Sequence, residues 1–261
     1  MVVLALQIAS RKRRDRAALA GKKAGVSRFQ PRFDKLPASQ RALWPSLAGA
    51  PSLGMVLYGG TGIALRLGHR SSVDFDFFRS DDLPSRDLLT DTFPFLAQAK
   101  ILQDEKNSLT VLAWPPGSNN DTVKLQFFGG ITIGRVGTPQ LTNDGVVEVA
   151  SLDDLMSTKV KVVMQRVVAK DYQDIAALIH AGVSLPRGLA AARLMYGPAF
   201  QPSESLKALT YFHGGDLEEV SQLDRETLVA AVQGVRELPE VRLADRELSA
   251  TIRQRARQWE L

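Results

Sequence analysis

The chain has 261 residues, 44% of them hydrophobic and 23% charged, a composition typical of a globular protein that can bury a sizeable core. It has no cysteine, which excludes disulfides and thiolate metal sites, and its three histidines lie far apart in the sequence. No apolar run approaches the ~20 residues of a membrane span, and the short apolar start lacks the basic residues of a signal peptide. We therefore expect a cytoplasmic protein with no membrane segment.

The net charge of +5 comes from the N-terminal segment. Residues 1–28 contain eight basic side chains and one acidic one, so the rest of the chain is slightly acidic. A basic segment of this kind suits nucleic acid, and the alternative is a segment with no defined structure. We interpret residues 1–35 as a basic arm that either binds nucleic acid or has no defined structure.

Residues 36–150 have the pattern of a small mixed β-sheet with a few helices. An apolar strand over 52–58 enters a turn formed by Gly59, Gly60 and Thr61, and a helix over 61–67 follows. A second strand is expected over 73–78. The other elements predicted here are helices over 37–47 and 85–98 and strands over 101–103, 108–114, 122–128, 131–136 and 146–149.

From residue 151 nearly all of the remaining chain has a helical pattern, and Ser151 is a suitable N-cap for the first helix. Helices are expected over 153–169, 172–181, 186–195, 202–212, 216–221, 224–237 and 244–259. The sequence therefore predicts an α+β fold. A small mixed sheet over 36–150 forms the core, and a mostly helical half over 151–261 completes the site.

The strand over 73–78 carries two acidic residues at alternate positions. Asp74 and Asp76 project from one face, while Phe75 and Phe77 project from the other. Two carboxylates on one face repel each other, and a cation between them removes that cost. The alternative is a surface pair that caps a turn. We expect Asp74 and Asp76 to bind Mg²⁺.

The glycine turn that precedes this strand can bind an anion. Glycine lets the backbone approach a ligand closely, and the amides at a helix start point outward. We expect Gly59, Gly60 and Thr61 to hold phosphate oxygens, with one hydrogen bond from the Thr61 hydroxyl. Arg70, in the following loop, either contacts phosphate, pairs with a carboxylate or is a surface charge. For the glycines, the alternative is a plain strand-to-helix turn.

A second set of charged residues lies on one face of the helical pattern over 159–178. At 100° per residue, Lys159, Arg166, Lys170 and Asp174 fall together, opposite an apolar face. Such a stripe can neutralise a triphosphate, and the alternative is a solvated helix face. Asp171 falls on the apolar face. Either the helix breaks at Lys170 and Asp171 caps a new one, which we prefer, or Asp171 is buried and pairs with a base.

The glycine turn, the aspartate pair and the charged stripe resemble the motifs of a known family. The sequence Gly59-Gly60-Thr61, followed by His-Arg-x-Ser and then Asp74-x-Asp76-Phe-Phe, resembles the first motif of the AbiEii/MenT-type nucleotidyltransferases. Those proteins are toxins of bacterial toxin–antitoxin systems and belong to the DNA polymerase β-like nucleotidyltransferase superfamily. A second match runs from Lys159 through the basic stripe to Asp174. The resemblance covers roughly residues 50–215.

The resemblance implies an Mg²⁺-dependent enzyme that moves a nucleoside monophosphate from a nucleoside triphosphate to an acceptor hydroxyl and releases pyrophosphate. RNA, such as a tRNA 3′ end, is the implied acceptor, with a small molecule as the variant, and a cognate antitoxin is the implied partner. Asp74, Asp76, Lys159 and Asp174 take the catalytic positions. The positions that contact the nucleotide are Gly59, Gly60, Thr61, Arg70, Arg166 and Lys170.

One position departs from the superfamily's pattern. Relatives often place a third carboxylate on a later strand beside the aspartate pair, and the strand over 122–128 presents Gln126 there instead. An amide cannot act as a general base. Either Asp174 does that work, or the protein binds the triphosphate with little or no turnover, as a regulatory or interaction module.

Overall fold

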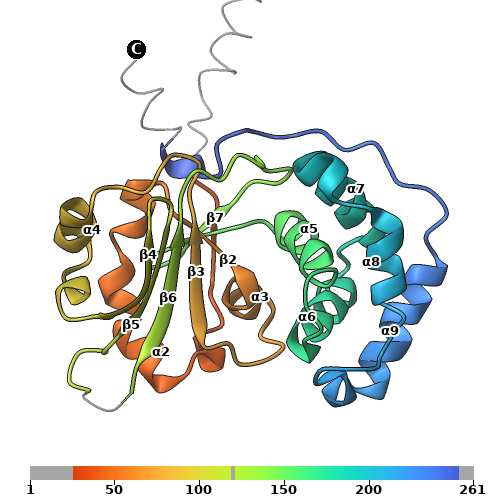
Figure 1. Cartoon of the computed structure of the whole chain (residues 1–261), viewed down its shortest axis with the longest axis horizontal. Coiled ribbons are helices and arrows are strands. Elements are labelled where there is room, and N and C mark those ends of the chain that lie inside the picture. The colour runs from red at the N-terminus through yellow and green to blue at the C-terminus, as the bar shows by residue number, and fades with distance from the viewer. Residues whose placement is uncertain (1–25, 119–120, 253–261) are drawn as a thin grey trace, which may run out of the picture.

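The computed structural model describes residues 26–118 and 121–252. An eight-stranded mixed sheet stands beside a group of helices from the second half of the chain (Figure 1). The strand order is β1-β7-β8-β2-β3-β6-β5-β4. The strands are β1 (Arg28–Phe29), β2 (Val56–Tyr58), β3 (Asp74–Phe78), β4 (Lys100–Glu105), β5 (Ser108–Ala113), β6 (Val123–Phe128), β7 (Gln140–Thr142) and β8 (Glu148–Val149). The predicted α+β class is confirmed.

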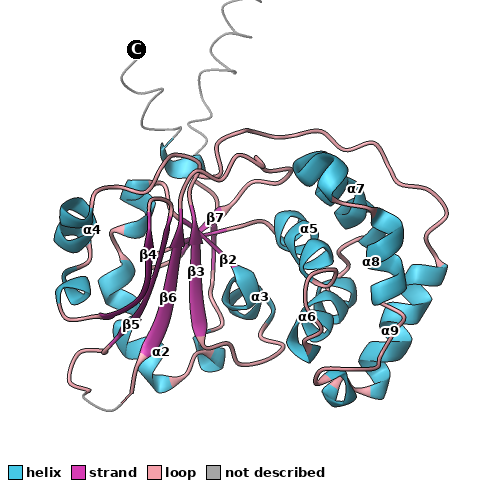
Figure 2. Cartoon of the chain, in the orientation of Figure 1, coloured by secondary structure: helices cyan, strands magenta, loops and turns pink. Residues whose placement is uncertain are grey.

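The helices fall into two groups (Figure 2). Those of the first half are α2 (Ala38–Leu43), α3 (Gly59–Leu67) and α4 (Arg86–Thr92). Those of the second half are α5 (Leu152–Val162), α6 (Ala169–His180), α7 (Leu185–Tyr196), α8 (Pro202–Ala208) and α9 (Gln222–Gln233). The helix α3 lies between the sheet and the second group, where it contacts α5 and α6. The second half therefore packs on the sheet through α3.

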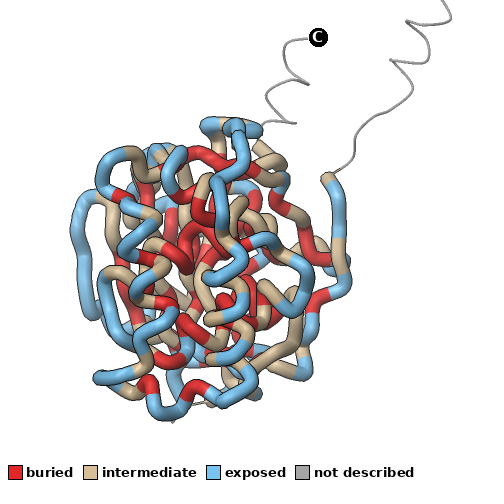
Figure 3. The backbone as a smooth tube through the Cα atoms, turned by 90° about the vertical axis from the view of Figure 1, so that its right-hand side faces the viewer, coloured by how far each residue is buried: buried red, intermediate tan, exposed pale blue. Residues whose placement is uncertain are grey.

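Each face of the sheet has its own hydrophobic core. The face toward α2 and α4 is packed with aromatic rings, among them Phe75 and Phe77 of β3 and Phe127 of β6. The other core joins Tyr58 and Ile63 to the apolar sides of α5, α6 and α7. Figure 3 shows the buried residues running through the interior and the exposed ones along the outer turns. The charged site described below lies on the face toward the helices.

The helix α3 is fixed to the sheet by one arginine. Arg66 Nε donates to the carbonyl of Ala150 at 2.8 Å, and its Nη2 donates to the carbonyl of Val149 at 2.9 Å. The strand β2 leads directly into α3, so the N-terminus of this helix lies at the end of β2 and beside Asp76, which pairs with Tyr58 across the strands. This arrangement places the glycine turn next to the aspartate pair.

Most predicted elements exist with shifted ends, and some are shorter, irregular or of another type. The segment 131–136 is irregular, with one bridge at Arg135, and the helix predicted over 153–169 ends at Val162. The helix predicted over 216–221 is a short 3₁₀ turn, Leu217–Glu219. Over 244–259, helical backbone begins only at residue 250, and residues beyond 252 lie outside the described ones. The strands β1 and β7, two and three residues long, have no counterpart in the sequence analysis.

The domain boundaries predicted from sequence also need one correction. Within residues 26–35, which we assigned to the basic arm, Arg28–Phe29 form β1 and pair with β7, and Phe33–Lys35 form a 3₁₀ turn. Residues 1–25 of that arm lie outside the described residues. The sheet ends at β8 and α5 begins at Leu152, close to the predicted division near residue 150. Within the described residues, no helix has the length and apolar character that crossing a membrane requires.

Buried polar contacts bring the end of the described chain back to the sheet. Glu148, fully buried on β8, accepts hydrogen bonds from the Ser249 hydroxyl and the Ala250 amide, both at 2.7 Å. The Arg135 guanidinium donates to the carbonyl of Glu247 at 2.9 Å. A buried charge needs such partners, so these contacts specify where residues 245–250 dock.

Candidate functional site

The strand β3 presents its two carboxylates as the alternation predicts. Asp74 and Asp76 are partly exposed, whereas Phe75 and Phe77 are fully buried on the opposite face. The two aspartates line a pocket of about 240 Å³. The other lining residues are Gly60, Arg70, Ser72, Val73, Lys124, Gln126, Lys159, Arg166, Val168, Lys170 and Asp171. Residues from β3, the N-terminus of α3, β6 and α6 therefore converge on one cavity, which we call the charged pocket.

Glycine is required at position 59 for two separate reasons. Gly59 has a φ of +69°, a conformation that side chains disfavour. A Cβ atom there would also overlap Oδ2 of Asp76 and lie 3.1 Å from its Cγ. The carboxylate of Asp76 thus folds closely over the turn, and the glycine lets it do so.

A Gly59→Ala substitution is expected to lower activity far more than a matched change elsewhere. The new methyl group must displace Asp76, and the positive φ adds a strain of about 1–3 kcal/mol. Gly117→Ala is the control, because Gly117 has a φ of +77° but nothing within 4 Å of the added Cβ. Nucleotide binding and thermal unfolding of both variants measure the difference. Equal losses in the two variants would show that Asp76 does not depend on this turn.

The N-terminus of α3 is open toward the charged pocket. No side chain caps it, and the first amides of a helix have no acceptor within the helix. Gly60 lines the pocket at this point, and a Cβ on it would overlap Nη2 of Arg70. Backbone amides, a helix dipole and a guanidinium therefore meet where an anion can be held.

Thr61 has a different position from the predicted one. It is fully buried, and its hydroxyl donates to the carbonyl of Asp74 and lies 2.9 Å from the Ser72 hydroxyl. These contacts occupy its hydroxyl, and Thr61 is not among the residues that line the pocket. Thr61 therefore fixes the start of β3 against α3 rather than binding phosphate.

A cluster of ion pairs forms part of the wall of the charged pocket, since Lys159, Arg166 and Asp171 all line it. Lys159 of α5, which is 5% exposed, places its Nζ 2.7 Å from Oδ1 of Asp171 and 2.6 Å from Oδ2 of Asp174. Arg166 forks onto Asp171 through Nε at 2.7 Å and Nη2 at 3.0 Å. Asp171 and Asp174 are both 0% exposed. Lys159 is thus a buried partner of two carboxylates that also lines the charged pocket, and its contact with a triphosphate stays a prediction.

Asp174 has all its acceptor positions occupied by cationic or imidazole donors. Its Oδ1 lies 2.7 Å from both Nε2 of His69 and Nε of Arg70, and its Oδ2 accepts from Nη2 of Arg70 at 2.9 Å. Burial raises the pKa of Asp174, but the charge of Lys159 and the hydrogen bonds from His69 and Arg70 outweigh it and bring the pKa well below its ordinary value. Asp174 stays ionised and does not line the pocket.

This geometry corrects two expectations. Asp174 was expected to supply the missing general base, but a carboxylate held in this way has a very low basicity and no free lone pair. It positions Arg70 and Lys159 instead. The preferred interpretation of Asp171, as a cap after a break at Lys170, is also wrong: the break spans residues 163–168, Val168 is the N-cap, and Asp171 is the buried partner of Lys159 and Arg166.

The strand β6 confirms the departure at Gln126. Along the parallel pairing of β3 with β6, Lys124 lies opposite Asp74 and Gln126 lies opposite Asp76. Both β6 side chains line the charged pocket. The position beside the aspartate pair is therefore occupied by an amide, and the third carboxylate of this pocket is Asp171, which comes from α6.

The aspartate pair could hold a divalent cation together with substrate oxygens. Burial, followed by the charge of Asp74, raises the pKa of Asp76 to about 6. A divalent cation between the two carboxylates would offset this repulsion, and magnesium typically takes one or two carboxylates together with phosphates. Among the described residues no group of three or more acidic, histidine or cysteine side chains could hold a metal alone. The pair therefore suits a metal that arrives with a phosphate ligand.

The charges around the pocket favour a polyanion. Five basic side chains line it, from Arg70, Lys124, Lys159, Arg166 and Lys170, against three acidic ones. Arg166 lies at the mouth, with 58% of its side chain exposed, although it also binds Asp171. A cation bound to the aspartate pair would increase the excess of positive charge, which suits a triphosphate.

The structure adds residues that the sequence analysis did not select. Asp171, Lys124 and Ser72 line the pocket, and His69 binds Asp174. The signal for Asp171 was its place on the apolar face of the helical pattern, since a buried carboxylate needs a cationic partner. Lys124 shares a face with Gln126 in the strand alternation, which is the signal that places it in the site.

Comparisons with known proteins agree with this geometry. A family model described as "Nucleotidyl transferase AbiEii toxin, Type IV TA system" matches residues 47–247, which include every residue of the charged pocket. An uncharacterized protein of Aquifex aeolicus (strain VF5) is 30% identical over 120 residues, covering 46% of this chain and 54% of the relative. The chain thus spans about half the length of that curated relative.

Proposed function

The chain belongs to the AbiEii nucleotidyl transferase toxin family, and on that premise we propose that it transfers a nucleoside monophosphate from a nucleoside triphosphate to an acceptor hydroxyl. The acceptor oxygen attacks the α-phosphorus, and pyrophosphate leaves. We propose RNA, such as a tRNA 3′ end, as the acceptor, in the cytoplasm, with an antitoxin protein as the partner that controls the activity. The convergence of Asp74 and Asp76 with the open N-terminus of α3 and a basic rim carries this proposal.

Each group of residues has a task that its position supports. Asp74 and Asp76 would hold Mg²⁺, which when bound orients the triphosphate and offsets charge on the leaving pyrophosphate. The amides at Gly60 and the side chains of Arg70 and Lys170 face the same cavity and can bind phosphate oxygens. Their preorganised charges cost no rearrangement when negative charge develops.

The ion-pair cluster holds these groups in place. The Asp174 carboxylate accepts two hydrogen bonds from Arg70. These bonds orient the guanidinium between the N-terminus of α3 and α6. Asp171 does the same for Arg166 at the pocket mouth. Lys159 forms ion pairs with the carboxylates of both Asp171 and Asp174. The two aspartates of α6 therefore act through the basic residues that they position.

A second candidate function is triphosphate binding with little or no turnover. The amide of Gln126 opposite Asp76 supports it, because that position offers no proton acceptor for the attacking hydroxyl. The charged pocket would bind the metal–triphosphate complex equally well in that case. Such a protein would act as a nucleotide-dependent regulatory or interaction module.

One assay separates the two candidates. The protein is incubated with each α-labelled nucleoside triphosphate, Mg²⁺ and bulk RNA, beside Asp74→Ala and Asp76→Ala variants. Transfer predicts label in RNA with the wild type alone, and a parallel incubation with small hydroxyl compounds tests the other acceptor class. Binding of triphosphate without incorporation into any acceptor would support the module. Absence of both binding and transfer would contradict both.

A further inference from the structure

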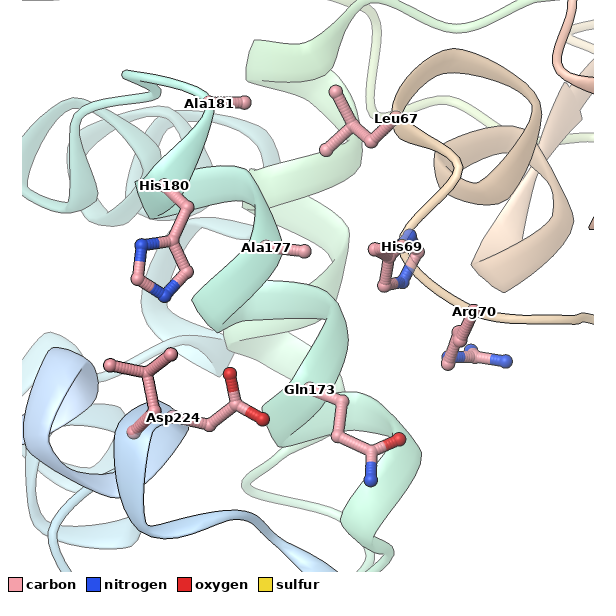
Figure 4. A pocket seen from close by; sticks show the side chains of 9 residues that line it. Leu67, His69, Arg70, Gln173, Ala177, His180, Ala181 and Asp224 are labelled. Atoms are coloured by element: carbon pink, nitrogen blue, oxygen red, sulfur yellow. The ribbon is translucent and has the colours of Figure 1, made fainter.

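A second pocket, of about 600 Å³, lies beside the charged one. It is formed by the end of α3, the loop after it, the middle and end of α6, and the start of α9 (Figure 4). His69 and Arg70 lie on one side, Ala177 lies in the middle, and His180 and Asp224 lie on the other side. Leu67, Gln173, Ala181 and Leu223 complete the lining. None of the site residues predicted from sequence, apart from Arg70, belongs to this pocket.

The two pockets share one wall. Arg70 lines both, and Asp174 holds its guanidinium through Nε at 2.7 Å and Nη2 at 2.9 Å. The helix α6 also passes along both, with Lys170 facing the charged pocket and Gln173 and Ala177 facing the second one. Because a helix rises 1.5 Å per residue, Ala177 is only about 10 Å along the helix from Lys170. A ligand joined to a phosphate in the charged pocket can therefore extend into the second pocket.

The lining of the second pocket differs from that of the charged one. Arg70 is its one lysine or arginine, whereas the charged pocket has five such residues. Two imidazoles and one guanidinium offer flat surfaces of the kind that stack on nucleobases. Gln173 and Asp224 offer hydrogen bonds to the edge of a base, and Leu67 and Ala177 supply apolar contact. This chemistry fits a base and ribose better than additional phosphate groups.

Several of these side chains are already oriented by the fold. His69 is held by Asp174 at 2.7 Å, and the His180 imidazole lies 3.1 Å from the Thr227 hydroxyl. Asp224 accepts a hydrogen bond from Ser221 through Oδ2 at 2.8 Å as part of the cap of α9, and its carboxylate points toward α6 in Figure 4. A preorganised pocket binds its ligand with a smaller entropy cost.

We propose that this second pocket binds the nucleoside of a nucleotide whose phosphates lie in the charged pocket. This inference rests on the proposed nucleotidyl transfer, because that reaction is what brings a nucleoside to the second pocket. Transfer involves two nucleosides, one in the triphosphate donor and one at the end of an RNA acceptor, and both have the chemistry that this pocket fits. The test therefore separates binding of a nucleoside from the identity of the molecule that supplies it.

Ala177→Phe is the variant that fills this pocket. Ala177 is partly exposed in the middle of α6, so a larger side chain extends into the cavity rather than into the core. Ala42→Phe is the matched control, because Ala42 is exposed on α2 and lines neither pocket. His180→Ala is a second variant, which removes an exposed imidazole from the lining of the pocket without adding bulk. Thermal unfolding of each protein establishes that it is folded.

The first measurement uses the four ribonucleosides, which lack phosphate, with saturation-transfer NMR or calorimetry. The wild type is expected to bind at least one of them with a Kd on the order of 0.1–1 mM. Ala177→Phe is expected to weaken that binding by about tenfold or more and His180→Ala by about threefold, because the cavity is filled or loses a stacking surface. Ala42→Phe should bind as the wild type does. No nucleoside bound by the wild type, or unchanged binding by Ala177→Phe, would overturn the inference whether or not transfer occurs.

The second measurement identifies the source through transfer kinetics. If the donor supplies the nucleoside, Ala177→Phe raises the KM of the triphosphate and leaves the affinity for Mg²⁺–tripolyphosphate unchanged. If the acceptor supplies it, the same variant raises the KM of the RNA alone. Unchanged KM values for both would overturn the inference while the proposed transfer stands. A wild type that binds nucleosides but transfers nothing would contradict the transfer and leave the pocket assignment in place.

Discussion

Replacing Asp76 with asparagine is expected to reduce nucleotidyl transfer by about 10³-fold or more, because metal-assisted stabilisation of charge contributes several kcal/mol to such reactions. The same change is expected to stabilise the metal-free protein at neutral pH by about 1–3 kcal/mol. It removes a carboxylate whose pKa is raised to about 6 by burial and by the charge of Asp74. Loss of activity together with a gain in stability is the signature of a residue kept for function.

The gain in stability depends on pH in a defined direction. The folded protein holds the proton of Asp76 more tightly than the unfolded chain, since a pKa of about 6 lies above the ordinary 3.8. The cost of the ionised group is therefore fully present above pH 6, falls as the pH falls through this window, and is absent below the ordinary pKa. Chemical denaturation without metal near pH 7.5 and near pH 4 measures it.

Asp91→Asn is the control for this comparison, because Asp91 is exposed on α4 and away from the site. It should match the wild type in activity and in stability at both pH values. Adding Mg²⁺ together with a non-hydrolysable nucleoside triphosphate should raise the stability of the wild type and raise that of Asp76→Asn much less. Full transfer activity in Asp76→Asn, or equal stability of the variant and the wild type at neutral pH, would contradict the assignment.

Replacing Asp174 with asparagine is expected to destabilise the protein by about 3–5 kcal/mol, or roughly 10 °C in Tm, because it removes the carboxylate that pairs with Arg70 and one of the two that pair with the buried Lys159. Lys159 and Arg70 both depend on this carboxylate, and Lys159 is almost fully buried. Transfer should fall as well, since Arg70 loses the partner that orients it. Differential scanning calorimetry together with the transfer assay measures both effects.

The alternative role for Asp174 predicts a different outcome. A general base replaced by asparagine would leave the fold intact and lose activity alone. Asp91→Asn again serves as the control, with no change in Tm expected. A variant Asp174→Asn with the wild-type Tm and no activity would contradict the positioning role and restore the catalytic one. A parallel loss of stability in Asp171→Asn would show that the whole ion-pair cluster is structural.

The site could be predicted best where one short-range pattern determines it. Alternation along a strand places Asp74 and Asp76 on one face regardless of the surroundings, and the same rule identifies Gln126 on β6. The glycines could be placed because they follow a buried strand, although Gly59 and Gly60 form the start of α3 rather than a turn ahead of it. The meeting of the turn with the aspartates then follows from the pairing of β2 with β3.

The roles of buried polar groups could not be predicted from local patterns. Thr61 and Asp174 were assigned by spacing to a ligand, but tertiary packing supplies their partners from within the chain. Residues 163–168 interrupt the helical segment, so Lys159 lies on α5 and Asp174 lies on α6. The angular pattern continues across these residues, and for that reason it does not reveal the interruption. The second pocket depends on the contact of α6 with α9 and α3, which no periodicity reveals.

The most direct test of the central claim is calorimetric titration of the protein with a non-hydrolysable nucleoside triphosphate, in the presence of Mg²⁺ and in the presence of EDTA. The wild type is expected to bind only with Mg²⁺, and Asp74→Asn is expected to lose that binding while keeping its fold. Binding that is equal in EDTA, or that survives in Asp74→Asn, would show that the aspartate pair and the N-terminus of α3 do not form a metal–triphosphate site.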